Sequence, residues 1–138
     1  MRSEETGTGV LEHWSPDEVA SALARGEAVL VDVRTPQEYM VEHIEAALLK
    51  PLAFFDPAHL PEDPGAGQGQ GSGSGKRVIL HCGSGVRSAR AAALCLGAGA
   101  GRAAHLEGGF AAWKAAGLPY VGTDMGSGAP KRMGLPTE

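Results

Sequence analysis

The chain of 138 residues is 43% hydrophobic and 20% charged, a composition typical of a single globular domain. Its net charge of −4 argues against nucleic acid as a partner, and no apolar run reaches the roughly 18 residues that a membrane span needs. The start, MRSEETGTGVLEHW, is acidic and lacks the apolar core of a secretory signal, so we expect a cytoplasmic protein with no membrane as a partner.

The charge is divided unevenly along the chain. Residues 1–75 carry 4 basic and 13 acidic residues, a net charge of −9, whereas residues 76–138 carry 8 and 3, a net charge of +5. A basic half favours an anionic substrate there. The two cysteines, Cys82 and Cys95, are separated by a predicted helical stretch, so we expect no disulfide, and the sequence offers no zinc-ligand spacing, so we expect no metal.

The first half predicts two capped helices and two strands. Residues 1–13 are expected to be a flexible lead-in to a domain over residues 14–121. Ser15 and Thr35 each precede a proline and lie three residues before a glutamate, a pattern typical of capping boxes at helix starts. AVLVDVR (28–34) between the helices predicts a buried strand, and AALLKPL (46–52) a weaker one.

The second half repeats the alternation of strand and helix. PEDPGAGQGQGSGSG (61–75) is of low complexity, and its Gly-rich part, 65–75, is expected to be a flexible loop within the domain. Strands are predicted at 76–81 and 102–107, helices at 87–99 and 108–117, and a disordered tail over 122–138. Alternating strands and helices predict an α/β domain with a mainly parallel sheet, in which ligands bind beyond the carboxyl ends of the strands.

Cys82 stands at such a strand end, within VILHCGSGVRSARAAALCLG (78–97). A helix start offers free N–H groups, Gly83 and Gly85 let the backbone curl around an anion, and Arg87 adds a cation. These features lower a thiol pKa, and the thiolate is the nucleophile. The pattern therefore predicts a catalytic cysteine in an anion cradle, with main-chain amides turned toward a thiol that is open to solvent.

Two phosphate-binding motifs fit this region poorly. GSGVRS (83–88) approximates the dinucleotide-binding G-x-G-x-x-G, but Ser88 occupies the third glycine position and only 31 residues follow Glu107, too few for the second half of such a fold. GSGSGK before Arg77 lacks the first glycine and the Ser/Thr of a P-loop, and a strand rather than a helix follows it.

The loop C-G-S-G-V-R-S from Cys82 to Ser88 resembles the active loop of the rhodanese family, C-x-x-G-x-R-S. DVRTPQEYMVEHIEAAL (32–48) and LEGGFAAWKAAGLP (106–119) resemble two further motifs of that family, and the resemblance runs from about Ser15 to Tyr120. It implies a three-layer α/β/α domain around a five-stranded, mainly parallel sheet. The loop departs from many relatives in having no basic residue immediately after the cysteine.

The resemblance implies a thiosulfate sulfurtransferase that acts through a Cys82 persulfide, with Arg87 as the second catalytic residue and no cofactor. The implied partners are a small anionic sulfur donor and a thiol or cyanide acceptor, which could be a protein thiol, and the protein would be a monomer or weak dimer. Substrate contacts are expected from the loop and from Arg34, with Asp32 in support. The loop members are Gly83, Ser84, Gly85, Val86 and Ser88.

Other readings of the same residues stay open. A persulfide carrier or interaction module with little turnover would use the same cysteine, and a cysteine-dependent phosphatase or arsenate reductase would use a similar loop. Four residues separate Cys82 from Arg87, whereas phosphatases of this type carry five, and the tighter ring favours a persulfide. Arg34 could hold an anion or instead buttress the loop. His81 precedes Cys82 on a strand and is expected to point to the opposite face of the sheet.

Overall fold

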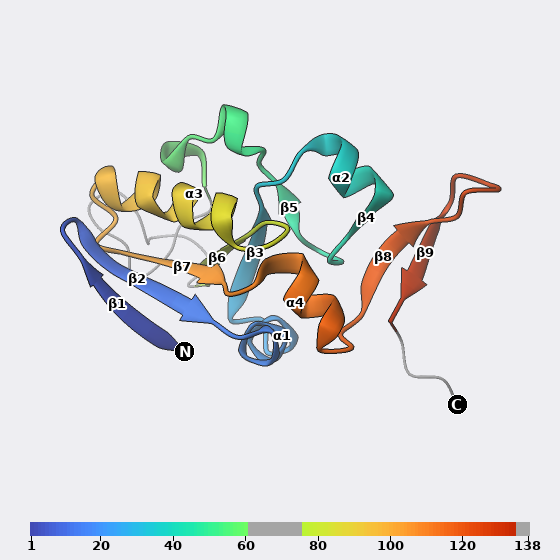
Figure 1. Ribbon diagram of the computed structural model, residues 1–138, viewed down its shortest axis with the longest axis horizontal. Coiled ribbons are helices and arrows are strands. Elements are labelled where there is room, and N and C mark those ends of the chain that lie inside the picture. Colours follow the sequence, from blue (N-terminus) through green and yellow to red (C-terminus); the bar gives the residue numbers. More distant parts are fainter. Residues whose placement is uncertain (61–75, 135–138) are drawn as a thin grey trace.

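The computed structural model describes residues 1–60 and 76–134 (Figure 1). The expected Gly-rich loop at 65–75 and the last residues of the expected tail, 135–138, lie outside the described residues.

A sheet of six strands forms the centre of the fold, in the order β1-β2-β7-β6-β3-β5. Only β1 and β2 pair in antiparallel fashion, and each other neighbouring pair is parallel. The strands are β1 (Arg2–Thr6), β2 (Gly9–Trp14), β3 (Ala28–Asp32), β5 (Leu48–Leu49), β6 (Arg77–His81) and β7 (Arg102–Leu106). The predicted mainly parallel α/β sheet is therefore confirmed.

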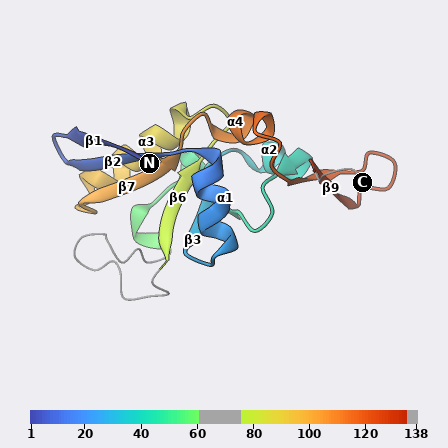
Figure 2. The same ribbon diagram turned by 90° about the horizontal axis from the view of Figure 1, so that it is seen from below.

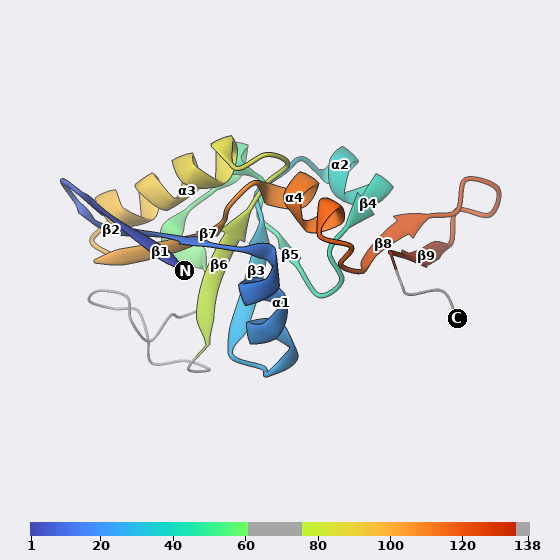
Figure 3. The same cartoon turned by 60° about the horizontal axis from the view of Figure 1, so that its bottom comes forward.

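Helices cover both faces of this sheet, which confirms the three-layer arrangement (Figure 3). Helices α1 (Pro16–Ala24) and α4 (Gly109–Ala115) pack on one face, around Leu30 and Ile79. Helix α3 (Val86–Gly97) packs on the other face. Leu52, Phe55 and Leu60, which lie in or beside the short 3-10 helices η1 (Leu52–Phe54) and η2 (Pro57–His59), pack against the same cluster. Because strand side chains alternate, Val78, Leu80 and Cys82 face α3, whereas Ile79 faces α1 and α4.

The two predicted helix starts are confirmed in detail. Ser15 Oγ accepts the N–H of Glu18, and the Glu18 carboxylate accepts the N–H of Ser15 in return, at the start of α1. Thr35 and Glu38 make the same reciprocal pair at the start of α2 (Pro36–Val41). Each box satisfies two N–H groups that the first turn leaves unpaired.

The expectation of a flexible lead-in at residues 1–13 is wrong. These residues form the hairpin β1–β2, and β2 pairs along its length with β7, from Val10–Arg102 to Trp14–Leu106. With both strands of this hairpin, the sheet has six strands instead of the expected five. Glu12, which makes the segment look polar, is buried because its carboxylate accepts hydrogen bonds from Arg77 at 2.8 Å and from Trp14 at 3.0 Å.

The expected disorder from residue 122 onward is also wrong for the described part of the tail. Strands β8 (Tyr120–Thr123) and β9 (Pro130–Met133) form a small antiparallel sheet with β4 (Glu42–His43). The Asp124 carboxylate accepts the N–H groups of Gly126 and Ser127 and so shapes the turn between β8 and β9. This ribbon lies at the opposite end of the molecule from the β1–β2 hairpin (Figure 2).

Within residues 1–60 and 76–134, helices of the length and apolarity needed to cross a bilayer are absent.

Candidate active site

Cys82 follows β6 directly, at the carboxyl end of the parallel sheet, and the loop after it curls back over the sulfur. The N–H of Gly85 donates to Cys82 Sγ at 3.0 Å. Gly85 has a φ of +108°, in the left-handed region, and forms the N-cap of α3. A Cβ at this position would be strained whatever the space, so the turn that brings the amide to the sulfur requires glycine.

Opposing effects act on the pKa of the Cys82 thiol. Burial is the largest and raises the pKa. Hydrogen bonds from the N–H and hydroxyl of Ser88 and from the N–H groups of Gly85 and Ser84 together outweigh it, and the pKa lies below its ordinary value. The amides are therefore turned toward the thiol, as expected for a cradle that stabilises a thiolate.

The thiol itself is covered, contrary to the expectation of an open nucleophile. The exposed fraction of Cys82 is 0%, whereas Ser84 and Val86 of the same loop are exposed. Helix α4 holds the start of the loop by two backbone hydrogen bonds. Phe110 N–H donates to the Cys82 carbonyl at 2.8 Å, and Ala111 N–H donates to the Gly83 carbonyl at 3.0 Å. In this conformation the sulfur is therefore not accessible to solvent.

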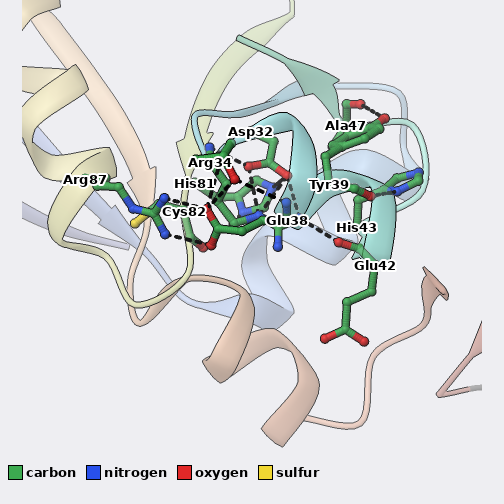
Figure 4. A network of polar contacts seen from close by, with 11 residues as sticks. Asp32, Arg34, Glu38, Tyr39, Glu42, His43, Ala47, His81, Cys82 and Arg87 are labelled. Atoms are coloured by element: carbon green, nitrogen blue, oxygen red, sulfur yellow. Dashed lines mark hydrogen bonds and ion pairs between the residues drawn. The ribbon is translucent and has the colours of Figure 1, made fainter. Parts of the chain in front are cut away.

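Arg87 lies in the first turn of α3 and reaches across to Glu38 of α2 (Figure 4). Its Nη1 is 2.7 Å from Glu38 Oε1 and its Nη2 is 3.0 Å from Oε2, a bidentate contact. The hydrogen bonds from Arg87 lower the pKa of Glu38 to about 2, against the opposing effect of burial. Glu38 was recognised in the sequence only as a capping residue and a family motif position, and its contact with Arg87 was missed.

Asp32 and Arg34 lie at the end of β3 but do not join the cradle. Arg34 Nε is 3.0 Å from both carboxylate oxygens of Asp32, and Nη2 donates to Asp32 Oδ2 and to the Glu42 carbonyl, each at 2.8 Å. The guanidinium also lies over the Phe110 ring, 4.7 Å from its centre. These contacts hold the Arg34 side chain between Asp32, Glu42 and Phe110, and its expected contact with a substrate stays a prediction.

His81 belongs to the same buried group, as Figure 4 shows. Its Nε2 is 3.5 Å from Asp32 Oδ2, and its Nδ1 is 3.2 Å from the Cys82 carbonyl. Burial is the main cause that lowers the pKa of His81. The prediction that His81 faces away from the thiol is confirmed, so the two side chains do not form a cysteine–histidine pair.

A pocket of about 440 Å³ opens beside Arg87. It is lined by residues 33–37, 51–54 and 87. Leu52 and Phe54 give it an apolar wall, and Arg34 and Arg87 are its basic lining residues. The pocket therefore lies next to Arg87, the residue expected to bind an anion.

The chain is similar to proteins of a known family. A sequence model of the Rhodanese-like domain matches residues 15–116. The chain belongs to this family. Cys82, Arg87 and the cradle thus lie within a rhodanese-like domain, and the fold expected from the resemblance is confirmed.

Three comparisons give the range of the family likeness. The uncharacterized protein slr1261 of Synechocystis is 38% identical over 109 residues, which cover 79% of this chain but 55% of that protein, so the chain spans about half of that relative. The thiosulfate sulfurtransferase GlpE of Pseudomonas syringae is 33% identical over 72% of this chain and 84% of its own. The solution structure of the rhodanese-like domain of Anabaena Alr3790 has a TM-score of 0.64 and 25% identity, and it covers 86% and 84% of the two chains. Relatives named sulfurtransferases support a general role in sulfur transfer.

Proposed function

We propose that this rhodanese-like domain is a sulfurtransferase that carries a sulfane sulfur on Cys82. The Cys82 thiolate attacks the outer sulfur of thiosulfate or a similar anionic donor, the donor's S–S bond breaks, and sulfite leaves with the bonding electron pair. A thiolate or cyanide then attacks the outer sulfur of the persulfide and restores the Cys82 thiolate. The observation that carries this proposal is the convergence of loop amides on Cys82 Sγ, led by Gly85 N at 3.0 Å.

The amides serve both states of the cysteine. A thiolate and a persulfide each bear one negative charge, and the N–H groups of Ser84, Gly85 and Ser88 already face the sulfur. Donors placed in advance where negative charge develops need little rearrangement during the reaction. The loop is therefore suited to a sulfur that stays anionic throughout the cycle.

Arg87 supplies the positive charge that an anionic donor needs. Arg87 lines the pocket of about 440 Å³, so a donor in that pocket would lie beside this residue. Because the exposed fraction of Cys82 is 0%, attack also requires the loop near Ser84 to open. The donor thus binds at Arg87 and reaches Cys82 after this local movement.

Mass spectrometry of the intact protein after incubation with thiosulfate tests the proposal. We expect the wild type to gain the mass of one sulfur atom, cyanide to remove it, and Cys95→Ser to gain it equally. Cys82→Ser is the matched control and should gain none. A wild type that gains no more sulfur than Cys82→Ser would overturn the proposal.

A persulfide carrier with little turnover is the second candidate. It is favoured by the low positive charge of the site, since Gly83 and Ser84 add none and Glu38 neutralises Arg87. A carrier would exchange sulfur rapidly with a loaded cysteine persulfide on a protein but turn over thiosulfate slowly. Comparing the two single-turnover rates on the same preparation separates the candidates.

A further inference from the structure

A series of polar side chains links the Cys82 sulfur to the protein surface. Cys82 Sγ lies 3.7 Å from Ser88 Oγ, which lies 2.9 Å from His105 Nδ1. His105 Nε2 is 2.9 Å from His13 Nδ1, and His13 Nε2 is 2.9 Å from Glu4 Oε1. Each contact joins an atom that can donate to one that can accept.

The sheet and helix α3 fix this alignment. His13 and His105 are direct register partners on the parallel strands β2 and β7, so their side chains lie on the same face. That face packs against α3, which supplies Ser88 from its first turn. The antiparallel pairing of β1 with β2 places Glu4 opposite Leu11, one diagonal step from His13 on the same face.

Exposure rises steadily along the series. Ser88 has an exposed fraction of 0% and His105 of 4%. The side chain of His13 is 11% exposed and that of Glu4 54%. The series therefore begins at the covered sulfur and ends in solvent, which is the layout of a path for a proton.

His105 is suited to the middle of such a path. Burial, followed by repulsion from His13, lowers the pKa of His105 to about 4. The imidazole is neutral near pH 7, and a neutral imidazole donates at one nitrogen while it accepts at the other. His105 can therefore take a proton from Ser88 at Nδ1 while it gives one to His13 from Nε2.

We propose that Ser88, His105 and His13 relay the thiol proton of Cys82 to the edge of the sheet, where His13 holds it against Glu4. This inference rests on the proposed role of Cys82 as the sulfur-carrying nucleophile. In the thiol state Cys82 donates to Ser88, Ser88 to His105, His105 to His13 and His13 to Glu4. In the thiolate state the first three bonds reverse, each residue having passed one proton along, and His13 becomes an imidazolium beside the Glu4 carboxylate.

Charged groups of both signs surround the two imidazoles. The carboxylates of Glu4 and Glu107 raise the pKa of His105, whereas Arg2 and His13 lower it. Arg2 is itself paired with Glu107 at 2.8 Å. His13 additionally contacts Glu4 directly, so a positive charge on His13 is matched by a carboxylate.

The pH dependence of Cys82 alkylation by the neutral reagent iodoacetamide tests the relay. We expect His13→Asn and His105→Asn each to move the midpoint of the rate profile up by about one pH unit, a tenfold loss of rate at neutral pH. Asparagine at 105 can keep the contact with Ser88, so the cradle stays intact while the link to His13 is cut. His59→Asn, at an exposed histidine outside the series, should leave the profile unchanged.

Glu4→Gln keeps the test valid if a histidine variant folds poorly. The side chain is more than half exposed, and glutamine retains an acceptor for His13 without the charge, so the midpoint should rise by a smaller step. Profiles of all three variants that coincide with the wild type would overturn the relay. Such a result would show that the hydrogen bonds serve only to satisfy buried polar atoms.

Alkylation and sulfur loading distinguish the two proposals. If the midpoints move but thiosulfate adds no sulfur to the wild type, the relay stands and the sulfurtransferase proposal fails. If the wild type gains sulfur and the midpoints coincide, the relay alone fails. A solvent deuterium effect on single-turnover persulfide formation that disappears in His13→Asn would connect the relay to the reaction.

Discussion

Arg87 and Glu38 face each other in a bidentate ion pair, although 49 positions separate them in the chain, with N–O distances of 2.7 and 3.0 Å. Glu38 therefore does two things. It holds the guanidinium beside the Cys82 loop, and it cancels part of the charge that an anionic donor would use. The balance between these effects can be measured.

Glu38→Gln is expected to lower the KM for thiosulfate by about threefold at low ionic strength. Glutamine keeps an oxygen for the Thr35 N–H and hence the helix cap, but it removes the negative charge from Arg87. Both side chains are about one-third exposed, so the effect corresponds to less than about 1 kcal/mol and should shrink as salt is added.

Glu45→Gln is the matched control, because it removes one charge from the surface pair with Arg132. Steady-state kinetics at low and high salt should show no change in KM for this variant. A higher KM in Glu38→Gln would contradict the prediction and show that holding Arg87 in place outweighs the gain in charge.

Gly109→Ala is expected to destabilise the domain by about 2 kcal/mol or more and to abolish sulfur loading. Gly109 has a φ of +62°, and an added Cβ would lie 2.6 Å from the Cys82 carbonyl oxygen and 2.7 Å from the Gly83 carbonyl. Both contacts are with backbone, so α4 or the cradle must shift. Urea denaturation and thiosulfate loading measure the two effects.

Gly97→Ala tests the same substitution where space is free. Gly97 ends α3, has an ordinary φ, and an added Cβ would meet nothing within 4 Å. Its stability should stay equal or rise by up to about 1 kcal/mol, because alanine favours helix. A Gly109→Ala protein as stable as Gly97→Ala would contradict the close packing of α4 against the cradle.

The sequence predicted the parts of the fold that depend on local signals. Each helix start is predicted from two residues three positions apart, Ser15 with Glu18 and Thr35 with Glu38. Both capping boxes are present in the structure. Cys82 at the strand end and the curl of Gly85 likewise follow from neighbours in the chain. These features were predicted because the interactions that produce them lie within one turn of the backbone.

Features that depend on distant pairing were missed. The sequence of β2 resembles a polar lead-in because it contains Glu12. In the structure Glu12 is paired with Arg77, which lies 65 positions away in the chain. His13 and His105 meet across 92 positions, and only the register of two parallel strands aligns them. The hydrogen bonds to the carbonyls of Cys82 and Gly83 also come from a distant part of the chain, the residues Phe110 and Ala111 of α4. Residue types alone carry no signal for such contacts.

Asp32→Asn is expected to cost about 3–5 kcal/mol of folding free energy, because it leaves a buried guanidinium without a counter-charge. The side chains of Arg34 and Asp32 are 5% and 0% exposed, and their contact is bidentate. Denaturant titration measures the loss, and Glu45→Gln, at an exposed pair, should change stability by less than about 1 kcal/mol. A small loss in Asp32→Asn would show that the buried guanidinium of Arg34 does not depend on Asp32 for its counter-charge.

Acid should destabilise the protein partly through His105. Its pKa falls from 6.5 to about 4 on folding, so the unfolded chain binds the proton more readily. The stabilising effect is complete above pH 6.5 and is lost as the pH falls from 6.5 toward 4, with a slope of at most about 1.4 kcal/mol per pH unit. The lowered pKa of His81 acts in the same direction.

His105→Asn should therefore flatten the plot of unfolding free energy against pH over this interval, while His59→Asn keeps the slope of the wild type. Glu38 acts at lower pH, since its pKa falls from 4.5 to about 2 on folding, and its contribution is lost only below pH 4.5. Urea denaturation at a series of pH values separates the two intervals. An unchanged slope in His105→Asn would mean that folding does not lower the pKa of His105, and it would contradict the burial of a neutral imidazole at this position.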